Sequence, residues 1–383
     1  MIKQYKFKTK PYAHQLEALE KSWAAETYAL FMEMGTGKSK VLVDNIAVLY
    51  DKGAIRGALI VAPKGVYKNW DQIEFPVHLP EHVEHTKVLW EPNITKKKQA
   101  ELDTLFDGKD DLKILIMNVE AFSTTKGLDF AHSFLNIFLG KALIGIDEST
   151  TIKSPTAKRT KNILKIGELA KYRRILTGSP VTKSPLDLYT QCKFLDPYHL
   201  DEDSYYAFRA RYSNMVKRNF GGRSVQLVVS YRRLDELAKK LEKFSYRVLK
   251  EDCLDLPPKV FTKRIVELSD EQKKMYLTMR SAAIAEQDGK VMSSMSALTT
   301  LLRLHQITCG TFKADDGTLT PIKNNRITAL MDCLEETDGK VIIWATYRED
   351  IKNIVESLKK AYGDASTVEY HGGVDSTLRQ KQI

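Results

Sequence analysis

Residues 31–40, FMEMGTGKSK, join an apolar run to two glycines, a lysine and a serine. Gly35 and Gly37 let the backbone turn its N–H groups toward phosphate oxygens, and a helix that begins near Lys38 adds its positive end. Lys38 supplies a charge for the outer phosphates of a nucleotide, and Ser39 supplies a hydroxyl for Mg²⁺. The stretch therefore predicts a P-loop, with a chance glycine turn as the alternative.

The strict P-loop pattern places a glycine where this chain has Met32. That glycine mainly eases the turn out of the preceding strand, and Gly35 can take the same role in a shorter G-x-G-K-S version. We therefore expect the phosphate-binding set to be Gly35, Thr36, Gly37, Lys38 and Ser39.

Short apolar runs alternate with stretches of helical spacing across the first half of the chain. This alternation predicts βαβ units, a buried parallel sheet flanked by helices and hence the α/β class. One helix is expected to follow the P-loop, and another to open at Ser154-Pro155. The expected strands are YALFMEM at 28–34, GALIVAP at 57–63, KILIMNV at 113–119, ALIGIDE at 142–148 and YRRILTG at 172–178.

Two acids end one of these runs, in LIGIDEST at 143–150. The carboxyl ends of parallel strands are where α/β folds bind ligands. Asp147 is expected to hold Mg²⁺ together with Ser39, and Glu148 to polarise the attacking water. A solvated strand end is the alternative, and it loses weight because a P-loop lies upstream.

Two further stretches carry weaker signals. The run RRILTGSP at 173–180 ends in Thr177, Gly178 and Ser179, which would couple the nucleotide site to a second ligand; a polar loop is the alternative. Gln15 precedes the P-loop, and its amide can both donate to and accept from an adenine edge. Considered alone, Gln15 is more simply a surface glutamine.

Composition limits the class of protein. The chain has 383 residues, which favours two domains, and a net charge of +10, which weakly favours a polyanionic partner. No uninterrupted apolar stretch reaches membrane-spanning length, and the N-terminus has no secretory signal. Four scattered cysteines, Cys192, Cys253, Cys309 and Cys333, suit free thiols in a reducing cytosol. We therefore expect a cytoplasmic protein without a membrane partner.

The pattern changes near residue 200. Residues 209–233 hold seven Lys/Arg and no acid, and Gly221-Gly222 predicts a hairpin turn between two β-compatible runs. A helix is expected over 234–250, and DLPPK at 255–259 reads as a linker. Beyond it, KRIVEL at 263–268, KVIIWAT at 340–346 and STVEYHGG at 366–373 predict strands of a second α/β domain. The expected domains are residues 1–200, a basic protrusion with its return helix at 201–255, and residues 256–383.

The order of these motifs resembles superfamily-two helicases, and within them the Swi/Snf-like DNA translocases of the compact phage or bacterial type. EMGTGKS and IDEST resemble the family's first and second motifs, and RRILTGSPVTKSPLDLYTQCKFLDP at 173–197 resembles the third with the stretch after it. APKGVYKNW, MNVEAF, FSYRVLKEDCLDLPPK and KVIIWATYRED resemble further motifs. The resemblance covers nearly the whole chain.

The resemblance implies a P-loop NTPase of two RecA-like lobes, with ATP and Mg²⁺ in the cleft and double-stranded DNA across the top. It implies that Gln15 contacts adenine, that Lys38, Asp147 and Glu148 are catalytic, and that Thr177–Ser179 couple hydrolysis to DNA. A helical or hairpin protrusion is expected on lobe one, where basic residues neutralise phosphates; a solvated basic face is the alternative. The expected DNA contacts are Lys64, Asn118, Arg209, Arg211, Lys217 and Arg218.

The chain also departs from the family pattern. Thr150 replaces the usual histidine of the second motif. The family's last motifs, which bring arginines to the γ-phosphate, lie beyond YHGGVDSTLRQKQI at 370–383, and Arg379 does not match them. Such arginines are worth about 10³–10⁵ in rate. We therefore expect a second lobe that is truncated, and weak hydrolysis by this chain.

The leading hypothesis is an ATP-dependent helicase or translocase whose DNA-stimulated hydrolysis drives movement along duplex DNA. One alternative is a regulatory module that binds ATP and DNA without turnover. The other is an RNA helicase, because superfamily-two motifs also serve RNA.

Overall fold

The computed structural model describes residues 2–220, 223–282, 284–287, 290–293 and 296–374. The chain divides into two compact units, Met1–Pro257 (unit 1) and Pro258–Ile383 (unit 2), within the proline pair of the expected linker. The expected turn at Gly221-Gly222 and the last arginine, Arg379, lie outside the described residues.

Unit 1 is built on a seven-stranded sheet in which every neighbouring pair is parallel. Its order is β3-β4-β2-β5-β6-β1-β9. The five runs expected to be strands form β1, β2, β4, β5 and β6, which confirms them. The two edge strands, β3 and β9, were not expected. The bounds are β1 Thr27–Met32, β2 Gly57–Ala62, β3 His85–Leu89, β4 Leu112–Asn118, β5 Ala142–Asp147, β6 Tyr172–Leu176 and β9 Ser245–Val248.

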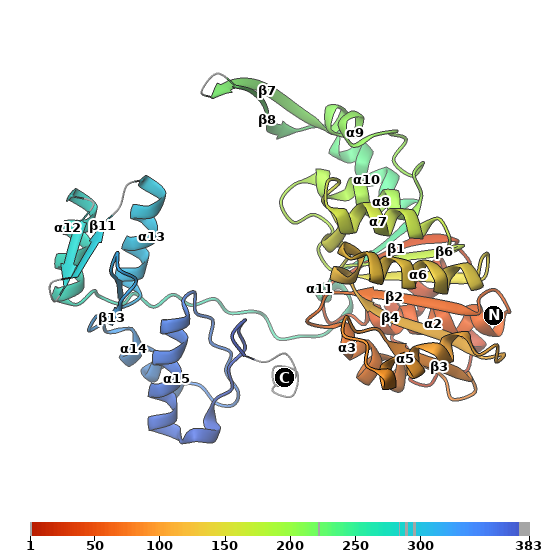
Figure 1. Cartoon of the computed structure of the whole chain (residues 1–383), viewed down its shortest axis with the longest axis horizontal. Helices are drawn as coiled ribbons and strands as arrows, with labels where there is room; N and C mark the ends of the chain where they lie inside the picture. Colours follow the sequence, from red (N-terminus) through yellow and green to blue (C-terminus); the bar gives the residue numbers. More distant parts are fainter. Residues whose placement is uncertain (1, 221–222, 283, 288–289, 294–295, 375–383) are drawn as a thin grey trace. The chain divides into compact units, whose positions relative to one another are not determined.

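Helices cover both faces of this sheet, as Figure 1 shows. The α/β class with flanking helices is thereby confirmed. The helices of unit 1 are α1 Ala13–Ser22, α2 Lys38–Asp51, α3 Tyr67–Asn69, α4 Phe75–His78, α5 Lys96–Asp103, α6 Thr125–Ile137, α7 Lys158–Gly167, α8 Leu188–Leu195, α9 Tyr205–Tyr212, α10 Leu234–Glu242 and α11 Lys250–Cys253. Short turns of helix are η1 Ile2–Gln4, the π-helix η2 Trp70–Glu74, η3 Thr104–Phe106, η4 Val119–Ser123, η5 Ser149–Ile152 and η6 Pro185–Asp187.

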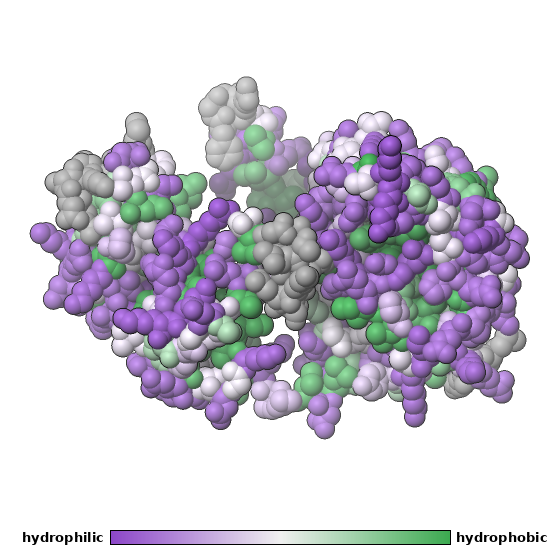
Figure 2. Space-filling model, turned by 60° about the horizontal axis from the view of Figure 1, so that its bottom comes forward, coloured by the Kyte–Doolittle hydropathy of each residue, from purple (hydrophilic) through white to green (hydrophobic). Residues whose placement is uncertain are grey.

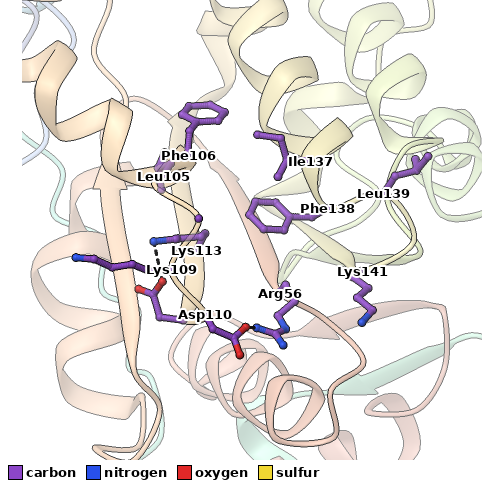
Figure 3. A pocket seen from close by; sticks show the side chains of 12 residues that line it. Arg56, Leu105, Phe106, Lys109, Asp110, Lys113, Ile137, Phe138, Leu139 and Lys141 are labelled. Atoms are coloured by element: carbon purple, nitrogen blue, oxygen red, sulfur yellow. Dashed lines mark ion pairs between the residues drawn. The ribbon is translucent and has the colours of Figure 1, made fainter.

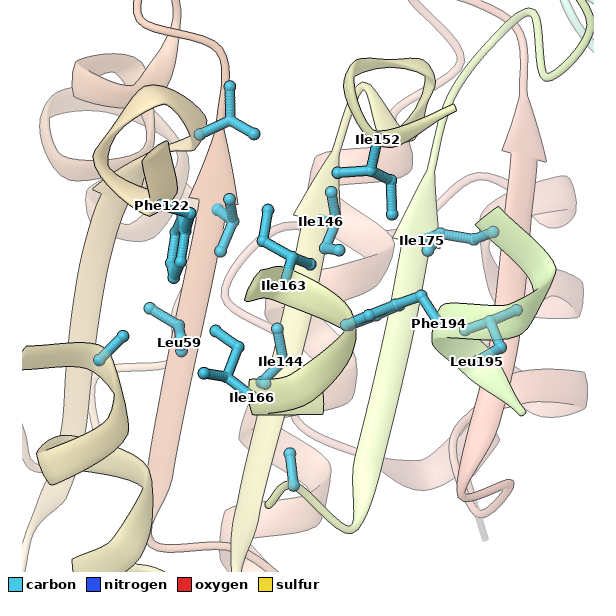
Figure 4. Packing of buried hydrophobic residues seen from close by; sticks show 14 of the residues in the cluster. Leu59, Phe122, Ile144, Ile146, Ile152, Ile163, Ile166, Ile175, Phe194 and Leu195 are labelled. Atoms are coloured by element: carbon cyan, nitrogen blue, oxygen red, sulfur yellow. The ribbon is translucent and has the colours of Figure 1, made fainter. Parts of the chain in front are cut away.

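The sheet separates two apolar cores, because successive side chains of a strand point to opposite faces. On one face, Ile144 and Ile146 of β5 pack with Ile163 and Ile166 of α7 and with Phe194 of α8 (Figure 4). On the other face, strand residues pack against α1, α2 and η2. Both faces are buried, so the strands carry continuous apolar runs and the polar ends of the strands are left to form a site.

Two expected helix bounds are wrong. Ser154 and Pro155 do not open α7; they form a turn closed by the Ala157 N–H and the Ser154 carbonyl at 3.4 Å, and α7 begins at Lys158. Proline suits the second position of such a turn as well as it suits a helix start. Residues 234–250 are not one helix either. The helix ends at Glu242 and β9 follows, because parallel pairing of Ala29–Met32 with Ser245–Val248 extends the sheet.

The basic stretch forms an antiparallel ribbon of β7 Ser213–Phe220 and β8 Arg223–Tyr231, reached through α9. The ribbon carries a register shift between Asn214 and Met215. Figure 1 shows it projecting from the helices of unit 1. Its paired strands agree with the hairpin that the sequence predicts, whereas the domain limits drawn at residues 200 and 255 stay a prediction.

In its described residues, unit 2 has helices and two short antiparallel pairs. A small core holds Met279, Met292, Ile307 and Phe312. The elements are α12 Asp270–Ala282, β10 Ile284–Gln287, β11 Lys290–Ser293, α13 Ala297–Thr308, β12 Thr311–Lys313, β13 Leu319–Pro321, α14 Arg326–Glu335, α15 Arg348–Tyr362 and η7 Asp364–Ser366.

The three strands expected in unit 2 are not formed. The segments 263–268, 340–346 and 366–373 have no strand pairing. The side chains of Ile342 and Trp344 are accordingly 81% and 91% exposed. An extended segment becomes a strand only by pairing with a neighbour, and the described residues of unit 2 offer these segments none.

Candidate nucleotide site

The P-loop connects the end of β1 to the start of α2. Gly35 and Gly37 both have left-handed backbones, with φ of +85° and +84°. A Cβ on Gly37 would lie 2.1 Å from the Gln15 side-chain nitrogen, so this position admits only glycine without displacement. At the helix start, the N–H groups of Lys38 and Ser39 have no partner within the helix and are free to bind an anion.

Two side chains at the start of α1 contact the backbone of the P-loop. Gln15 Nε2 donates to the Thr36 carbonyl at 3.1 Å, and His14 Nε2 lies 2.8 Å from the same oxygen. The Gln15 oxygen accepts from the Tyr12 N–H at 3.0 Å. Gln15 is only 5% exposed, so the alternative of a surface glutamine is wrong. Its contact with adenine stays a prediction, because its amide groups bind protein partners in this structure.

Lys38 lies at the first position of α2 and is nearly buried. Its ammonium nitrogen is 3.6 Å from Glu148 Oε1. The structure therefore brings together the first and second motifs, which are more than a hundred residues apart in the sequence, at the carboxyl ends of β1 and β5 on either side of β6.

Asp147 ends β5 and is buried. Its Oδ2 accepts from the Trp70 indole N–H at 3.0 Å, and its Oδ1 accepts from the Glu148 N–H at 3.0 Å. Burial raises the pKa of the Asp147 carboxyl, and the nearby Glu148 charge adds to that effect, while the Trp70 bond and the Lys38 charge oppose it. A buried carboxylate that is only partly compensated in this way attracts a cation.

Glu148 has a left-handed backbone, with φ of 46° and ψ of 62°. Such a conformation costs about 1–3 kcal/mol in a residue other than glycine. The turn brings its side chain beside β6, where the Thr177 hydroxyl donates to Glu148 Oε2 at 3.2 Å. The Ser179 N–H in turn donates to the Thr177 oxygen at 3.2 Å. The acids and the expected coupling loop therefore form one hydrogen-bonded chain.

Gly178 fits closely against the P-loop. A Cβ at this position would lie 3.0 Å from the Met34 backbone nitrogen. The start of α11 also reaches the loop, since the Lys250 N–H donates to Glu33 Oε2 at 2.8 Å. The contact of Gly178 with Met34 places the 177–179 segment beside the P-loop.

Two site residues were missed from the sequence, Trp70 and Glu74. Both lie on η2, whose π-helical turn is closed by the Phe75 N–H and the Trp70 carbonyl. The Ser39 hydroxyl and the Lys38 charge lower the pKa of Glu74, but burial and the Asp147 charge outweigh them and raise it. The burial of Trp70 cannot be read from KNWDQIE at 68–74, so the sequence carried no signal for the role of either residue.

The oxygen donors at this edge suit Mg²⁺. Ser39 offers a hydroxyl and Asp147 a carboxylate, which are the hard ligands that Mg²⁺ prefers. Within the described ranges, no group of three His, Cys, Asp or Glu residues forms a metal site by itself. The remaining ligands would thus be water and phosphate oxygens, as is usual for Mg²⁺ bound with a nucleotide.

The residues expected to contact DNA differ in whether their side chains are exposed or already bonded within the protein. Lys64 is exposed just after β2. Asn118 is buried, and its side-chain oxygen caps η4 by accepting from the Ala121 N–H at 2.9 Å. The contact to DNA from either residue stays a prediction, and the structure favours Lys64 because its side chain has no such structural role.

The basic residues of α9 and of the ribbon also differ in whether their side chains have partners within unit 1. Arg211 is engaged by Glu236 at 2.7 Å and by Glu202 at 3.4 Å. The Arg209 guanidinium lies 5.3 Å from the centre of the Tyr206 ring. Lys217 and Arg218 are exposed and, as neighbours in β7, point to opposite faces of the ribbon.

A separate hollow of about 280 Å³ lies at the opposite, amino-terminal ends of β2, β4 and β5 (Figure 3). Arg56 forms an ion pair there with Asp110, and Lys113 contacts Asp107 at 2.7 Å. The charges of Arg56 and Lys113 are thus each paired with a carboxylate.

Hydrophilic side chains cover most of the face in Figure 2. In the part of the chain that the structure describes, no helix is both long and apolar enough to span a membrane. All four cysteines are unpaired, as their scattered spacing predicts.

Comparison with known proteins identifies the family. The chain is 27% identical over 275 residues to the Helicase-like transcription factor of Oryctolagus cuniculus, a match that covers 67% of this chain and 24% of that protein. It is 24% identical over 332 residues to the "Uncharacterized ATP-dependent helicase MG018" of Mycoplasma genitalium, covering 85% of this chain and 29% of that protein. The chain thus spans less than a third of the length of either relative.

A solved structure is similar in fold. The "Sulfolobus solfataricus SWI2/SNF2 ATPase core in complex with dsDNA" aligns with 98% of this chain and 75% of its own, with a TM-score of 0.50 and 20% identity. The profile of a family described as the SNF2-related domain matches residues 14–312, which is more than half of the chain. The predicted resemblance to Swi/Snf-like helicases is confirmed, and the chain belongs to the SNF2-related domain family.

Proposed function

We propose that this chain binds ATP with Mg²⁺ at the carboxyl edge of the unit 1 sheet, that it hydrolyses ATP only weakly by itself, and that hydrolysis at this site serves movement along double-stranded DNA. The observation that supports this most directly is the convergence of three motifs at one edge. Lys38 lies 3.6 Å from Glu148, and Glu148 accepts a hydrogen bond from Thr177 at 3.2 Å.

Each residue at this edge has a defined task. The backbone N–H groups of residues 35–39 bind the phosphates at the positive end of α2, and Lys38 neutralises the outer phosphate. Ser39 and Asp147 would hold Mg²⁺. When bound, this ion neutralises charge on the outer phosphate oxygens.

Glu148 would change partners when the nucleotide binds. Without nucleotide, its carboxylate contacts the Lys38 ammonium on one side and the Thr177 hydroxyl on the other. Phosphate competes for Lys38, which frees Glu148 to accept a hydrogen bond from the attacking water. Because Thr177 is bonded to Glu148 and to the Ser179 N–H, this exchange would also move the 177–179 loop and link hydrolysis to the track.

The DNA surface would use exposed cations that have no structural partner here. Lys64, Lys217 and Arg218 meet that requirement better than Arg211, whose side chain is paired with Glu236. Asn118 is uncharged and buried, and its side chain caps η4. Contacts to phosphate are largely independent of sequence, which suits a protein that moves along its track. The related Sulfolobus ATPase core was solved in complex with double-stranded DNA, which supports DNA over RNA as the track of this chain.

The test is ATP binding and turnover, with and without duplex DNA. Lys38→Ala should abolish nucleotide binding, while Lys52→Ala, an exposed lysine after the other end of the same helix, should leave binding unchanged. Unchanged binding in Lys38→Ala would refute the site. Duplex RNA in place of DNA separates the two tracks, and binding of ATP and DNA without turnover would favour the regulatory alternative.

A further inference from the structure

The edge strand β9 brings a second lysine to the P-loop. β9 pairs with β1 so that Val248 lies opposite Met32, and the Glu33 N–H donates to the Val248 carbonyl at 3.0 Å. Because the two strands are parallel, the residues that follow them leave the sheet at the same carboxyl edge. Lys250, two residues after β9, therefore lies beside the loop that follows Met32.

The backbone of Lys250 is fixed to that loop. Lys250 is the first residue of α11, and its N–H donates to Glu33 Oε2 at 2.8 Å. The Glu33 carbonyl accepts in turn from the Thr36 N–H at 3.2 Å and from the Thr36 hydroxyl at 2.7 Å. Glu33 thus connects the start of α11 to the turn of the P-loop, so Lys250 keeps a defined position relative to the loop.

The side chain of Lys250 lies over Gly35. A Cβ built on Gly35 would lie 3.1 Å from Lys250 Cε and 3.3 Å from the ammonium nitrogen. Lys250 is only partly exposed, which agrees with a stem that packs on the loop while the charged end reaches water. The ammonium is therefore next to one of the residues expected to bind phosphate.

The ammonium of Lys250 is not neutralised by a carboxylate. In the part of the chain that the structure describes, Lys250 forms no ion pair, whereas Lys38 is paired with Glu148 at 3.6 Å. Among the same residues, the N–H groups of Gly35 and Gly37 donate to no backbone carbonyl. Free backbone N–H groups beside an unpaired cation make a site that favours an anion.

We propose that Lys250 is a second phosphate-binding lysine of the nucleotide site: its ammonium neutralises phosphate charge beside Gly35, while Lys38 does so from α2. The proposal rests on the proposed function, because it requires the P-loop to bind ATP. Lys250 lies shortly before unit 1 ends at Pro257. Phosphate bound by Lys250 would therefore also hold the segment through which the chain leaves unit 1.

The test compares the affinities of ATP, ADP, AMP and inorganic triphosphate, measured in excess Mg²⁺ by titration calorimetry on the full chain. Lys250→Met removes the charge and keeps an unbranched side chain over Gly35. We expect ATP to bind about 10-fold more weakly, as for the loss of one charge-assisted hydrogen bond. Inorganic triphosphate should lose the same factor, because it has no base or ribose. The loss should decrease from ATP to ADP to AMP, because attraction to the lysine grows with phosphate charge.

The salt dependence of ATP binding gives a second readout. Salt screens attraction between charges, so the affinity of Lys250→Met for ATP should fall less steeply with KCl concentration than that of the unaltered chain. A lysine that only supports the shape of the loop would leave this dependence unchanged.

Three further variants complete the design. Lys250→Arg keeps a positive charge and should retain most of the affinity for ATP. Lys250→Gln also removes the charge, and it decides the matter if Lys250→Met does not fold. The matched control is Lys243→Met: Lys243 is exposed and precedes β9, whereas Lys250 follows it. This control changes the net charge equally at the other end of the strand and should leave all four affinities unchanged.

The outcomes separate the two proposals. No ATP binding by the unaltered chain would refute the proposed function. Normal ATP binding by the unaltered chain, with the same affinity in Lys250→Met and Lys250→Gln, would refute the role of Lys250 alone. Equal losses in Lys250→Met and Lys250→Arg, or an unchanged salt dependence in Lys250→Met, would also refute it, because the charge of Lys250 would then play no part.

Discussion

Gly37→Ala tests the P-loop geometry most directly. The backbone at Gly37 is left-handed, with φ of +84°, and a Cβ there would lie 2.1 Å from Gln15 Nε2. The Gln15 side chain must therefore leave the Thr36 carbonyl, which it now binds at 3.1 Å. His14 stays beside that carbonyl, so the oxygen keeps one partner.

The expected cost has two parts. A left-handed backbone costs a residue with a Cβ about 1–2 kcal/mol. The lost Gln15 hydrogen bond adds about 0.5–1.5 kcal/mol. Gly37→Ala should thus lower the free energy of unfolding of unit 1 by about 2–3 kcal/mol. Gly53→Ala is the matched control, since Gly53 follows the other end of α2 with φ of +66° and nothing within 4 Å of its Cβ position.

Urea unfolding followed by far-UV circular dichroism measures both variants. Gly37→Ala should cost about 1 kcal/mol more than Gly53→Ala and should alone weaken ATP binding. Adding Gln15→Ala to Gly37→Ala should cost less than Gln15→Ala in the unaltered chain, because the bond is already lost. Equal costs for the two glycine variants, or full additivity with Gln15→Ala, would show that the contact with Gln15 carries no energy.

Two further predictions concern buried charges. Burial raises the pKa of Asp44 to about 6, although Lys40 pairs with it at 2.8 Å. The folded chain therefore holds this proton more tightly than the unfolded chain, and stability should fall as pH rises from about 4 to about 6. Asp44→Asn should gain about 2–3 kcal/mol relative to the unaltered chain across that window, measured by urea unfolding at each pH; a constant difference would contradict this. Arg174 is fully buried and donates to Asn45 and to four backbone carbonyls. Arg174→Met should therefore lower the free energy of unfolding, measured in urea, by about 3–5 kcal/mol. A loss below about 1 kcal/mol would contradict this prediction.

The sequence was sufficient for the features that depend on local pattern. The apolar runs before Gly35 and Asp147 predicted strands, and the glycines, lysine and acids at their ends predicted a nucleotide edge. These signals are local because a P-loop needs particular residues at consecutive positions, and because a buried parallel strand is apolar on both faces. The five central strands and the family follow from them.

Pairing between segments that are distant in the sequence decided which other segments became strands. Nothing in Ser245–Val248 separates a strand from a continuation of α10; it is a strand because β1 has a free edge beside it. The segment 340–346 has a stronger strand pattern, yet its Trp344 side chain is 91% exposed and no neighbour pairs with it. When the backbone N–H and C=O groups of a segment form hydrogen bonds only with another segment, the secondary structure of that segment cannot be predicted from its own sequence.

In the candidate site, too, some residues could be predicted from the sequence and others only from the tertiary structure. Lys38, Asp147 and Glu148 could be named from the sequence, since Lys38 lies within the P-loop motif and the two acids lie together within IDEST. Trp70 could not, because an indole nitrogen 3.0 Å from Asp147 is a relation between distant segments. The sequence by itself determined which groups can bind phosphate and Mg²⁺. The tertiary structure alone decided which side chains orient those groups, because hydrogen bonds act over a few ångströms of space and not along the chain.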